Sequence, residues 1–511
     1  MSAGSGRWRG SSSAQGRSSL LPFRGGRRGS YPSQRRTQMV SQIAARPPSP
    51  PLGQVLATLS DVDLANPSDL HGYPAKISSC KDIASYNWLN EQEPTILVPG
   101  LQPLVPILQY LQQFEEAEET QLTPTKGKPP AWAPPATTTK LKEDNGNYFR
   151  DPNAARYSAH PIEPAVQAIF ASEPDFPTDS IDVFACSSTL GNLLRFVRKV
   201  DKSFRILVEA VGDTVFFVRR ENSPTELIPG VTGFGHTFPE AYTTWDAEVK
   251  KSVSHQRIIR YELGGLDCVV RFAADGYHKE LVSQGSEVAQ RLEPAKADTF
   301  SDMLASALSN SAIDDHPPAQ DKPLNVLHGG QQIPRAAVFD LKTRSIRKKD
   351  QDTLGEELPR LWVAQVPNFI LAYHTSGIFE EIQIRNVQHE VEDWECENED
   401  TIRRFAVLLR KIVAFARSTV DRKIELRSSE VNVLELREQT EDVRQTLPAV
   451  VEARWINANP DGSESSSDES QGPDLRTLSE PEDSLDWDEG SEKDFTACSA
   501  EDCGYCGHCS Y

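Results

Sequence analysis

The sequence predicts an α+β fold, a mixed β-sheet core flanked by helices, with long disordered tails at both ends. Between residues 148 and 425, short runs rich in β-branched and aromatic residues alternate with segments of helical period. The clearest helix covers residues 400–418, where apolar residues recur at helical spacing and form one buried stripe. Residues 1–50 contain nine Arg and no acid, a composition that cannot bury enough apolar surface to fold.

Local patterns predict the other elements of the domain. Residues 204–211 and 214–221 flank a Gly-Asp pair, which predicts a β-hairpin with a two-residue turn. We expect a helix over residues 236–251, with Pro239 in its first turn, where a missing N–H costs little. The remaining expected elements are strands at 269–272 and 336–342, a helix at 356–366, and strands at 368–375 and 378–385.

Composition divides the chain into consecutive segments. The folded domain is expected to span residues 148–425, with a polar loop insertion at 278–333. The flanking segments are a disordered Arg/Gly/Ser-rich arm (1–50), a partly ordered extension with a Pro-rich linker (55–147), a C-terminal extension (426–460), an acidic disordered tail (461–497) and a Cys-rich terminus (498–511).

Charge and cysteine content restrict the environment in which the chain is expected to work. The formal net charge is −20, and the eight cysteines show no disulfide pattern, which fits a reducing compartment. The most apolar stretch, residues 95–111, is interrupted by three prolines and makes a poor membrane span. We therefore expect a nuclear or cytoplasmic protein with no membrane partner.

The basic arm indicates the expected partner. Guanidinium groups bind phosphate through a fork of donors, and Trp8, Phe23 and Tyr31 offer ring faces on which bases can stack. RNA is therefore the leading expected partner of the arm, and a solubilising or targeting tail is the alternative. The acidic tail is expected to be solvated, although phosphorylation of its serines would let it compete with nucleic acid for a basic groove.

The string AAVFDLKTRS, residues 336–345, carries the strongest chemical signal. It places Asp340 and Lys342 two positions apart on a buried strand, so both side chains lie on the same face. There an acid and an ammonium group could share one metal-bound water. Upstream, the strand LDCVVRFAAD ends at Asp275. Two strands that end on acids, the second followed by Lys, resemble the core of the PD-(D/E)XK nucleases.

Several strings between residues 180 and 420 resemble the decapping nuclease (DXO-like) family of that superfamily, eukaryotic enzymes that process incompletely capped RNA 5′ ends. DLKTRS resembles the family's acid-Leu-Lys motif, and LPRLWVAQVPNFILAYHTSGIFEEI resembles its Trp-x-x-Gln helix and the following strand. GNLLRFVRKVDKSFRILVEAVGDTVFFVRRE resembles its helix and hairpin, and GFGHTFPEAY its Gly-aromatic-x-Phe-Glu element. The chain is identified as a divergent, fungal-type member.

This resemblance implies a divalent-metal-dependent hydrolase of RNA 5′ ends, of decapping, pyrophosphohydrolase or exonuclease type. It also implies RNA and an exonuclease or other RNA-processing protein as partners. Lys342 would orient or deprotonate a metal-bound water, and Gln365 would position the water or a substrate phosphate. Catalysis would further involve Glu240 and Asp340. The implied ligands of Mg²⁺ or Mn²⁺ are the carboxylates of Glu240, Asp275 and Asp340 and the backbone carbonyl of Leu341.

The chain also departs from the family pattern. Ala273 stands where the family has a Glu, Pro239 is inserted into the Phe-Glu element, and the Arg that precedes the family's first long helix has no counterpart in CSSTLGNLL. Two functions therefore remain open, an active hydrolase and a catalytically impaired relative that binds RNA or a nuclease partner. A metal-diphosphate transferase is disfavoured, because the Asp314-Asp315 pair is followed by His-Pro-Pro, which cannot continue a helix.

The last fourteen residues contain a separate motif of four cysteines. Glycines at 504 and 507 permit tight turns between them, and four thiolates can close a tetrahedral structural zinc site. The alternative is an exposed thiol-rich tail that is redox-active or binds another soft metal. The expected zinc ligands are Cys498, Cys503, Cys506 and Cys509.

Overall fold

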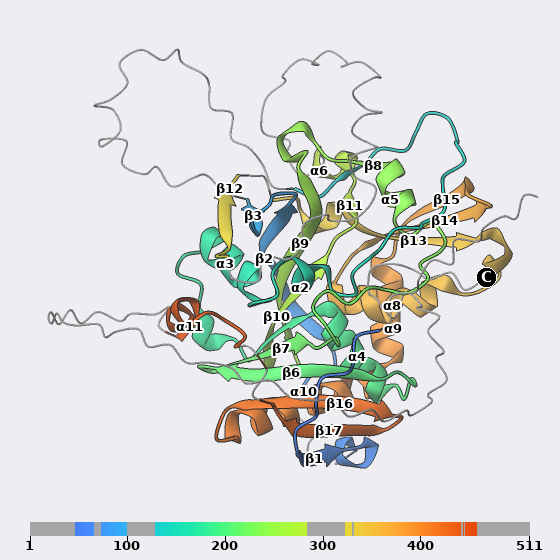
Figure 1. The fold of residues 1–511 in the computed structure, drawn as a ribbon. Coiled ribbons are helices and arrows are strands. Elements are labelled where there is room, and N and C mark those ends of the chain that lie inside the picture. Colours follow the sequence, from blue (N-terminus) through green and yellow to red (C-terminus); the bar gives the residue numbers. More distant parts are fainter. Residues whose placement is uncertain are drawn as a thin grey trace, which may run out of the picture. The chain divides into compact units, whose positions relative to one another are not determined.

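Two mixed β-sheets form the framework of the protein (Figure 1), which confirms the predicted α+β fold class. The computed structural model describes residues 46–65, 73–99, 128–283, 322–329, 332–440, 443 and 445–456, all within the unit from Ala44 to Tyr511. The larger sheet has eleven strands, in the order β1 (Val55–Leu59), β17 (Val433–Glu438), β16 (Lys423–Glu430), β6 (Phe204–Val211), β7 (Thr214–Arg219), β5 (Val183–Cys186), β10 (Leu266–Ala273), β9 (Ser252–Leu263), β2 (Ile77–Leu89), β3 (Thr95–Val98) and β12 (Asn325–His328).

The smaller sheet is continuous in sequence with the larger one through β10. This strand ends at Ala273, and β11 begins at Gly276 in the smaller sheet. Asp275 therefore lies where the chain passes from one sheet to the other. The smaller sheet has the order β15 (Ile378–Asn386), β14 (Asn368–Thr375), β13 (Val338–Ser345), β11 (Gly276–Tyr277), β4 (Ala131–Trp132) and β8 (Thr243–Thr244).

Helices cover both faces of the larger sheet. In β5, Val183 and Ala185 pack into one core cluster and Phe184 into another, as the period of a strand requires. The first cluster contains residues of α4, α8, α9 and α10, and the second contains residues of α3 and α11. The described helices are α2 (Pro152–Arg156), α3 (Glu163–Ser172), α4 (Ser187–Val197), α5 (Thr237–Tyr242), α6 (Lys279–Ser283), α8 (Thr353–Ala364), α9 (Gln388–Glu397), α10 (Glu399–Ser418) and α11 (Ala449–Ile456).

Two predictions of local structure hold well. The apolar stripe of the expected helix at 400–418 is buried in α10, and β6 and β7 form the expected antiparallel hairpin around Gly212. The φ of Gly212 is +58°, a conformation that suits Gly in a two-residue turn. No helix among the described residues is long and apolar enough to cross a membrane.

Other segments differ from the sequence-based expectation. The helix expected over residues 236–251 ends at Tyr242, because Thr243 and Thr244 instead pair with β4. The segment 55–147 supplies β1, β2 and β3 to the larger sheet, and β12 arises within the segment 278–333 and pairs with β3. These pairings join strands that are distant in sequence, so local patterns do not reveal them. Residues 498–511 and most of the expected arm and acidic tail lie outside the described residues.

The turn between β9 and β10 fixes the strand that leads to Asp275. Gly264 and Gly265 form it, with φ values of +57° and +77°. Positive φ at both central residues is the signature of a type I′ hairpin turn, which matches the twist of the flanking strands. A Cβ added at Gly264 would lie 2.3 Å from the Cβ of Ala406 on α10. This turn thus also sets how closely α10 packs on the sheet.

We expect Gly264→Ala to lower the free energy of unfolding by about 2–4 kcal/mol, from the unfavourable φ and the clash with Ala406. Denaturant unfolding measures this loss. The matched control is Gly191→Ala on α4, where an added Cβ meets nothing within 4 Å. The free energy of unfolding of that variant should increase by up to about 1 kcal/mol, because Ala has a higher helix propensity than Gly. Equal effects of the two substitutions would contradict the packing argument.

Candidate functional site

A cavity of about 910 Å³ is lined by α4, α8, the β6–β7 hairpin and the ends of β10, β13 and β16. Its lining contains ten Arg or Lys and five Asp or Glu, although the whole chain has a formal net charge of −20. Positive charge is therefore concentrated around this cavity. The basic lining residues include Arg195, Arg198 and Lys202, on α4 and the loop after it, and Arg205, Arg219 and Arg220, on the hairpin and just after it.

A buried network of acids and cations contributes to the cavity lining. Asp340 of β13 and Glu357 of α8 line it, and their exposed fractions are 6% and 5%. Arg360 of α8 binds both of them. Its Nη2 donates to Asp340 Oδ1 at 2.9 Å, its Nη1 donates to Oδ2, and its Nε donates to Glu357 Oε2 at 2.7 Å. One guanidinium group thus bridges two carboxylates from different elements.

Lys342 completes the network on the same face of β13. Its Nζ lies 3.0 Å from Glu357 Oε1, and only 5% of its side chain is exposed. Asp340 and Lys342 therefore both reach α8, as the alternation of side chains along a strand predicts. The opposite face of β13 carries Phe339 and Leu341, which pack in an apolar cluster with residues of α5. Strand geometry alone separates the charged face from the apolar one.

Asp275 adjoins Asp340 through the backbone of β13. The N–H of Leu341 donates to Asp275 Oδ2 at 2.7 Å, which fixes the carboxyl beside the strand. Gly276 allows this approach, because a Cβ there would lie 2.4 Å from the Phe339 ring. Burial, and then the charge of Asp340 and a hydrogen bond with it, raise the pKa of Asp275 well above its ordinary value. Burial and the neighbouring carboxylate thus favour the protonated form of Asp275.

The cations determine the charge state of the other acid. Burial raises the pKa of Glu357, but the charges of Lys342 and Arg360 outweigh it and leave that pKa well below its ordinary value. Burial lowers the pKa of Arg360, whereas Asp340 and Glu357 together raise it well above the ordinary value. These shifts favour the anionic form of Glu357 and the cationic form of Arg360.

The residues of this site do not fit a divalent cation in the arrangement described. Among the residues described by the structure, no three His, Cys, Asp or Glu side chains are placed so that they could hold a metal ion. Asp340 is engaged by Arg360, Asp275 is bound to the Leu341 N–H, and Ala273 brings no carboxylate to the cavity. Magnesium and manganese need several oxygen ligands around one point. The guanidinium group holds the position on Asp340 that such an ion would require.

Two residues implied by the resemblance lie outside this network. Glu240 is an exposed residue of α5. Loss of water around its carboxyl group, caused by neighbouring atoms, raises its pKa, and the charge of Asp144 raises it further. Gln365 is the left-handed C-cap of α8, with φ of +53°, and its Nε2 donates to the Trp362 carbonyl at 2.7 Å. Neither has a recorded contact with Asp275 or Asp340. The expected zinc ligands, Cys498, Cys503, Cys506 and Cys509, lie outside the described residues.

Glu357 and Arg360 are the site residues that the sequence interpretation missed. They lie three positions apart, which places them on one face of a helix. The signal was present in EELPRLW, since this helix directly follows the strand that carries Asp340 and Lys342. A buried strand with charges on one face requires countercharges on the element that packs against it.

Fold and site together define an α+β protein in which a basic cavity ends on a buried network of acids and cations. The chain belongs to the family described as "Domain of unknown function (DUF8563)", whose model matches residues 74–452. A search of curated proteins found no significant match.

The chain is also similar to several solved structures. S. pombe Rai1 is 10% identical, with a TM-score of 0.42, and the match covers 75% of this chain and 99% of that one. Scheffersomyces stipitis Rai1 in complex with (3′-NADP)⁺ and calcium ion is 9% identical, with a TM-score of 0.45 and coverage of 80% and 100%. Candida albicans Rai1 in complex with pU5-Mn²⁺ is 10% identical, with a TM-score of 0.41 and coverage of 81% and 100%.

We expect Asp275→Asn to flatten the pH dependence of stability. The folded wild type holds a proton on Asp275 that the unfolded chain releases above about pH 4, so stability falls as pH rises toward the raised pKa. Asn can still accept from Leu341 and can donate to Asp340 without titrating. Between about pH 4 and the raised pKa, the free energy of unfolding of the variant should therefore increase relative to that of the wild type by about 1.4 kcal/mol for each pH unit.

Denaturant unfolding at several pH values between about 5 and 9 measures this difference. The control is Asp267→Asn on β10, which removes a carboxylate that is paired with Arg260 rather than with another acid. It should not flatten the profile. Parallel profiles for wild type and Asp275→Asn would show that the pKa of Asp275 is not raised.

Proposed function

We propose that this protein binds the 5′ end of RNA in the basic cavity. The observation that carries the proposal is the surplus of basic over acidic side chains around that cavity, in a chain that is strongly acidic as a whole. Phosphate groups bind such a surface through charge and through the donors of Arg, at a strength that depends on salt. A cavity of about 910 Å³ lies at the upper end of the range for small-ligand pockets, which suits a few nucleotides of single strand.

The charge at one part of the cavity favours an end of the strand over its interior. Asp340, Glu357 and Arg360 line this part of the cavity, which we call the floor. A terminal phosphate carries more negative charge than an internal diester. The guanidinium group of Arg360, whose side chain is 28% exposed, is available to that phosphate from the cavity side.

A second function, hydrolysis of the bound end, is supported by Asp340 at the floor and by Asp275 and Lys342, which lie close behind it. Catalytic acids and bases typically occur where burial and neighbouring charges shift pKa values, as they do for Asp275. In the described arrangement, however, Asp340 is held by Arg360 and Lys342 by Glu357. Hydrolysis therefore requires that Arg360 leave Asp340, and Mg²⁺ and Mn²⁺ are the ions to test.

Substituting both Arg198 and Lys202 with Ala should weaken RNA binding by about tenfold and reduce the slope of log affinity against log salt by about one unit. Both residues line the cavity, whereas Lys250 and Lys251 are exposed and do not. The double Ala variant at 250 and 251 removes the same charge elsewhere and should bind like the wild type.

Fluorescence anisotropy with short single-stranded RNAs measures both effects. RNAs that carry a 5′-triphosphate, a 5′-monophosphate or a 5′-hydroxyl group distinguish binding to an end from binding along the strand. We expect the phosphorylated ends to bind at least about threefold tighter, because only they place extra charge at the floor. Equal binding of all three RNAs, or equal losses in the two double variants, would refute the proposal.

Hydrolysis is tested with the same RNAs, Mg²⁺ or Mn²⁺, and two variants at the floor. Arg360→Gln removes the cation from Asp340, so we expect product formation about tenfold faster than in the wild type. Asp340→Asn should abolish it. Thermal unfolding of each variant establishes that it is folded. No product from any variant, with RNA still bound, would leave binding as the function of the site.

A further inference from the structure

A proline-rich segment crosses the edge of the cavity. Residues 46–51 have the sequence Arg-Pro-Pro-Ser-Pro-Pro and no helix or strand, and we refer to them as the proline strap. Arg46 and Ser49 of the strap line the cavity. The prolines fix φ and favour an extended backbone, so the strap stays extended although it pairs with no strand.

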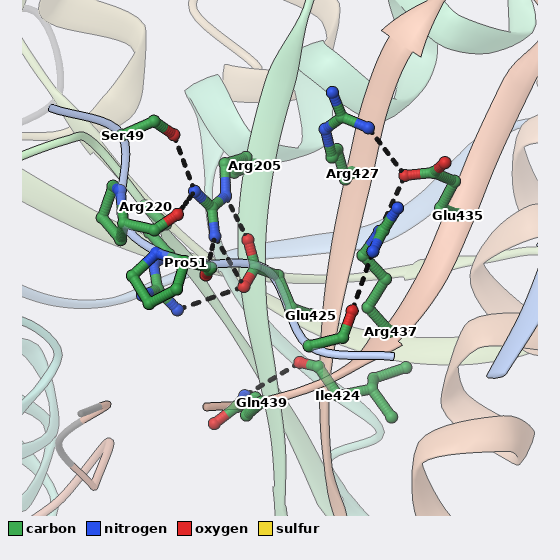
Figure 2. Close-up of polar contacts among 12 residues, drawn as sticks. Ser49, Pro51, Arg205, Arg220, Ile424, Glu425, Arg427, Glu435, Arg437 and Gln439 are labelled. Carbon is green, nitrogen blue, oxygen red and sulfur yellow. Dashed lines mark hydrogen bonds and ion pairs between the residues drawn. The ribbon is translucent and has the colours of Figure 1, made fainter. Parts of the chain in front are cut away.

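Arg205 of β6 fastens the strap (Figure 2). Its Nη1 donates to Ser49 Oγ at 2.9 Å and to the Pro50 carbonyl at 2.6 Å, and its Nη2 donates to the Pro51 carbonyl at 3.0 Å. The other edge of the same guanidinium group binds the Glu425 carboxylate of β16. A single side chain thus joins the strap to the sheet.

Positive charge exceeds negative charge at this point. Glu425 is fully buried, and Arg220 also binds it, with 3.1 Å between Nη1 and Oε2. Two guanidinium groups therefore face one carboxylate. The hydroxyl group of Ser49 accepts a hydrogen bond from the first of them, on the side that faces the cavity and its further basic residues.

We propose that Ser49 is a phosphorylation site for a proline-directed protein kinase, and that its phosphate binds Arg205. Ser49 is exposed, extended and followed by Pro50, the arrangement that such a kinase reads. The γ-phosphoryl group of a nucleoside triphosphate is transferred to Ser49 Oγ. The O–H bond breaks and an O–P bond forms; the proton passes to the kinase's base, and the nucleoside diphosphate leaves.

The chain contains a second Ser-Pro dipeptide that provides an internal comparison. Ser223 precedes Pro224, but its Oγ accepts from Thr225 N at 3.3 Å and its carbonyl accepts from Glu226 N at 3.0 Å. These bonds fold the dipeptide into a turn, which a kinase cannot read as an extended strand. Ser49 and Ser223 thus share the local sequence and differ in backbone conformation.

The consequence for RNA rests on the proposed function of the cavity. A phosphoserine adds a charge of about −1.5 to −2 and three acceptor oxygens. Placed beside Arg205, the phosphate would neutralise positive charge that is otherwise available to RNA phosphates. We expect phosphorylation of Ser49 to weaken RNA binding by about fivefold and to hold the strap more firmly on the sheet.

The test treats the full chain with a purified proline-directed kinase and ATP, and maps the modified residues by mass spectrometry. We expect modification of Ser49 and none of Ser223, and loss of Ser49 modification in Ser49→Ala. Modification of Ser223 in preference to Ser49, or of neither, would overturn the assignment of the site.

Thermal unfolding then reports the contact with Arg205 whether or not the protein binds RNA. Protein with phosphoserine at position 49, made by the kinase or by genetic incorporation, should melt about 2 °C higher than the unmodified protein. Arg205→Lys keeps a cation beside Glu425 but loses the forked guanidinium donors. In this variant the increase in melting temperature should shrink by at least about half. An equal gain in both backgrounds would overturn the role of Arg205.

RNA affinity is measured on the same samples as the ratio between phosphorylated and unmodified protein. If the unmodified protein fails to bind RNA, the proposed function fails, and the mapping and melting data still decide whether Ser49 is the site. If it binds and phosphorylation leaves the affinity unchanged, the regulatory consequence fails alone.

Discussion

The hold of Arg360 on Asp340 and Glu357 is the interaction on which the site depends. Both carboxylates are almost completely buried, and an unpaired buried charge costs several kcal/mol. Asp340 belongs to β13 and Glu357 to α8, so the guanidinium group neutralises the sheet and the helix at the point where they meet. Lys342 supplies a second cation beside Glu357. These ion pairs join α8 to the smaller sheet at the floor of the cavity, beside the apolar contacts that α8 makes in the large core cluster.

The pairing of one buried acid with two cations, as at Glu357, recurs twice beside the cavity. Glu425 is buried and faces Arg205 and Arg220, and Glu226 is 2% exposed and faces Arg46 and Arg150. In each case one buried acid orients two guanidinium groups, and a net positive charge is left beside the cavity. Orientation by a buried acid keeps the long Arg side chains from losing conformational entropy again when a ligand binds. An acidic protein can thus present a rigid basic surface.

The elements that depend on neighbouring residues could be predicted from sequence. The stripe of α10, the β6–β7 hairpin and the common face of Asp340 and Lys342 all follow from the periods of helix and strand. The partners of those two charges could not be predicted, because they depend on how α8 docks against β13. Gln365 shows the same limit. Its Trp-x-x-Gln pattern is clear in sequence, but the left-handed C-cap returns its amide to the helix, away from the acids.

Long-range pairing was the other obstacle. Strand β1 pairs with β17, which lies nearly at the other end of the described chain. From local sequence, the segments that contain these two strands were predicted to be extensions outside the folded domain. Only the docking of the strap and of β1 beside β16 and β17 brings Ser49 to Arg205. Proline content correctly indicated a segment without helix or strand, but it carried no information about what that segment would contact.

Under the proposed function, a terminal phosphate and a carboxylate would compete for one cation at the floor of the cavity. Arg360 binds Asp340 in the described arrangement, and a terminal phosphate would bring more charge to the same guanidinium group than one carboxylate does. As Arg360 turns toward the phosphate, Asp340 loses its countercharge while it remains buried. The carboxylate then needs another cation or a firmer share of the proton on Asp275. Under the proposed function, binding of an RNA end would therefore be coupled through Arg360 to release of Asp340, and this would link the recognition of phosphate to any chemistry that the acids perform.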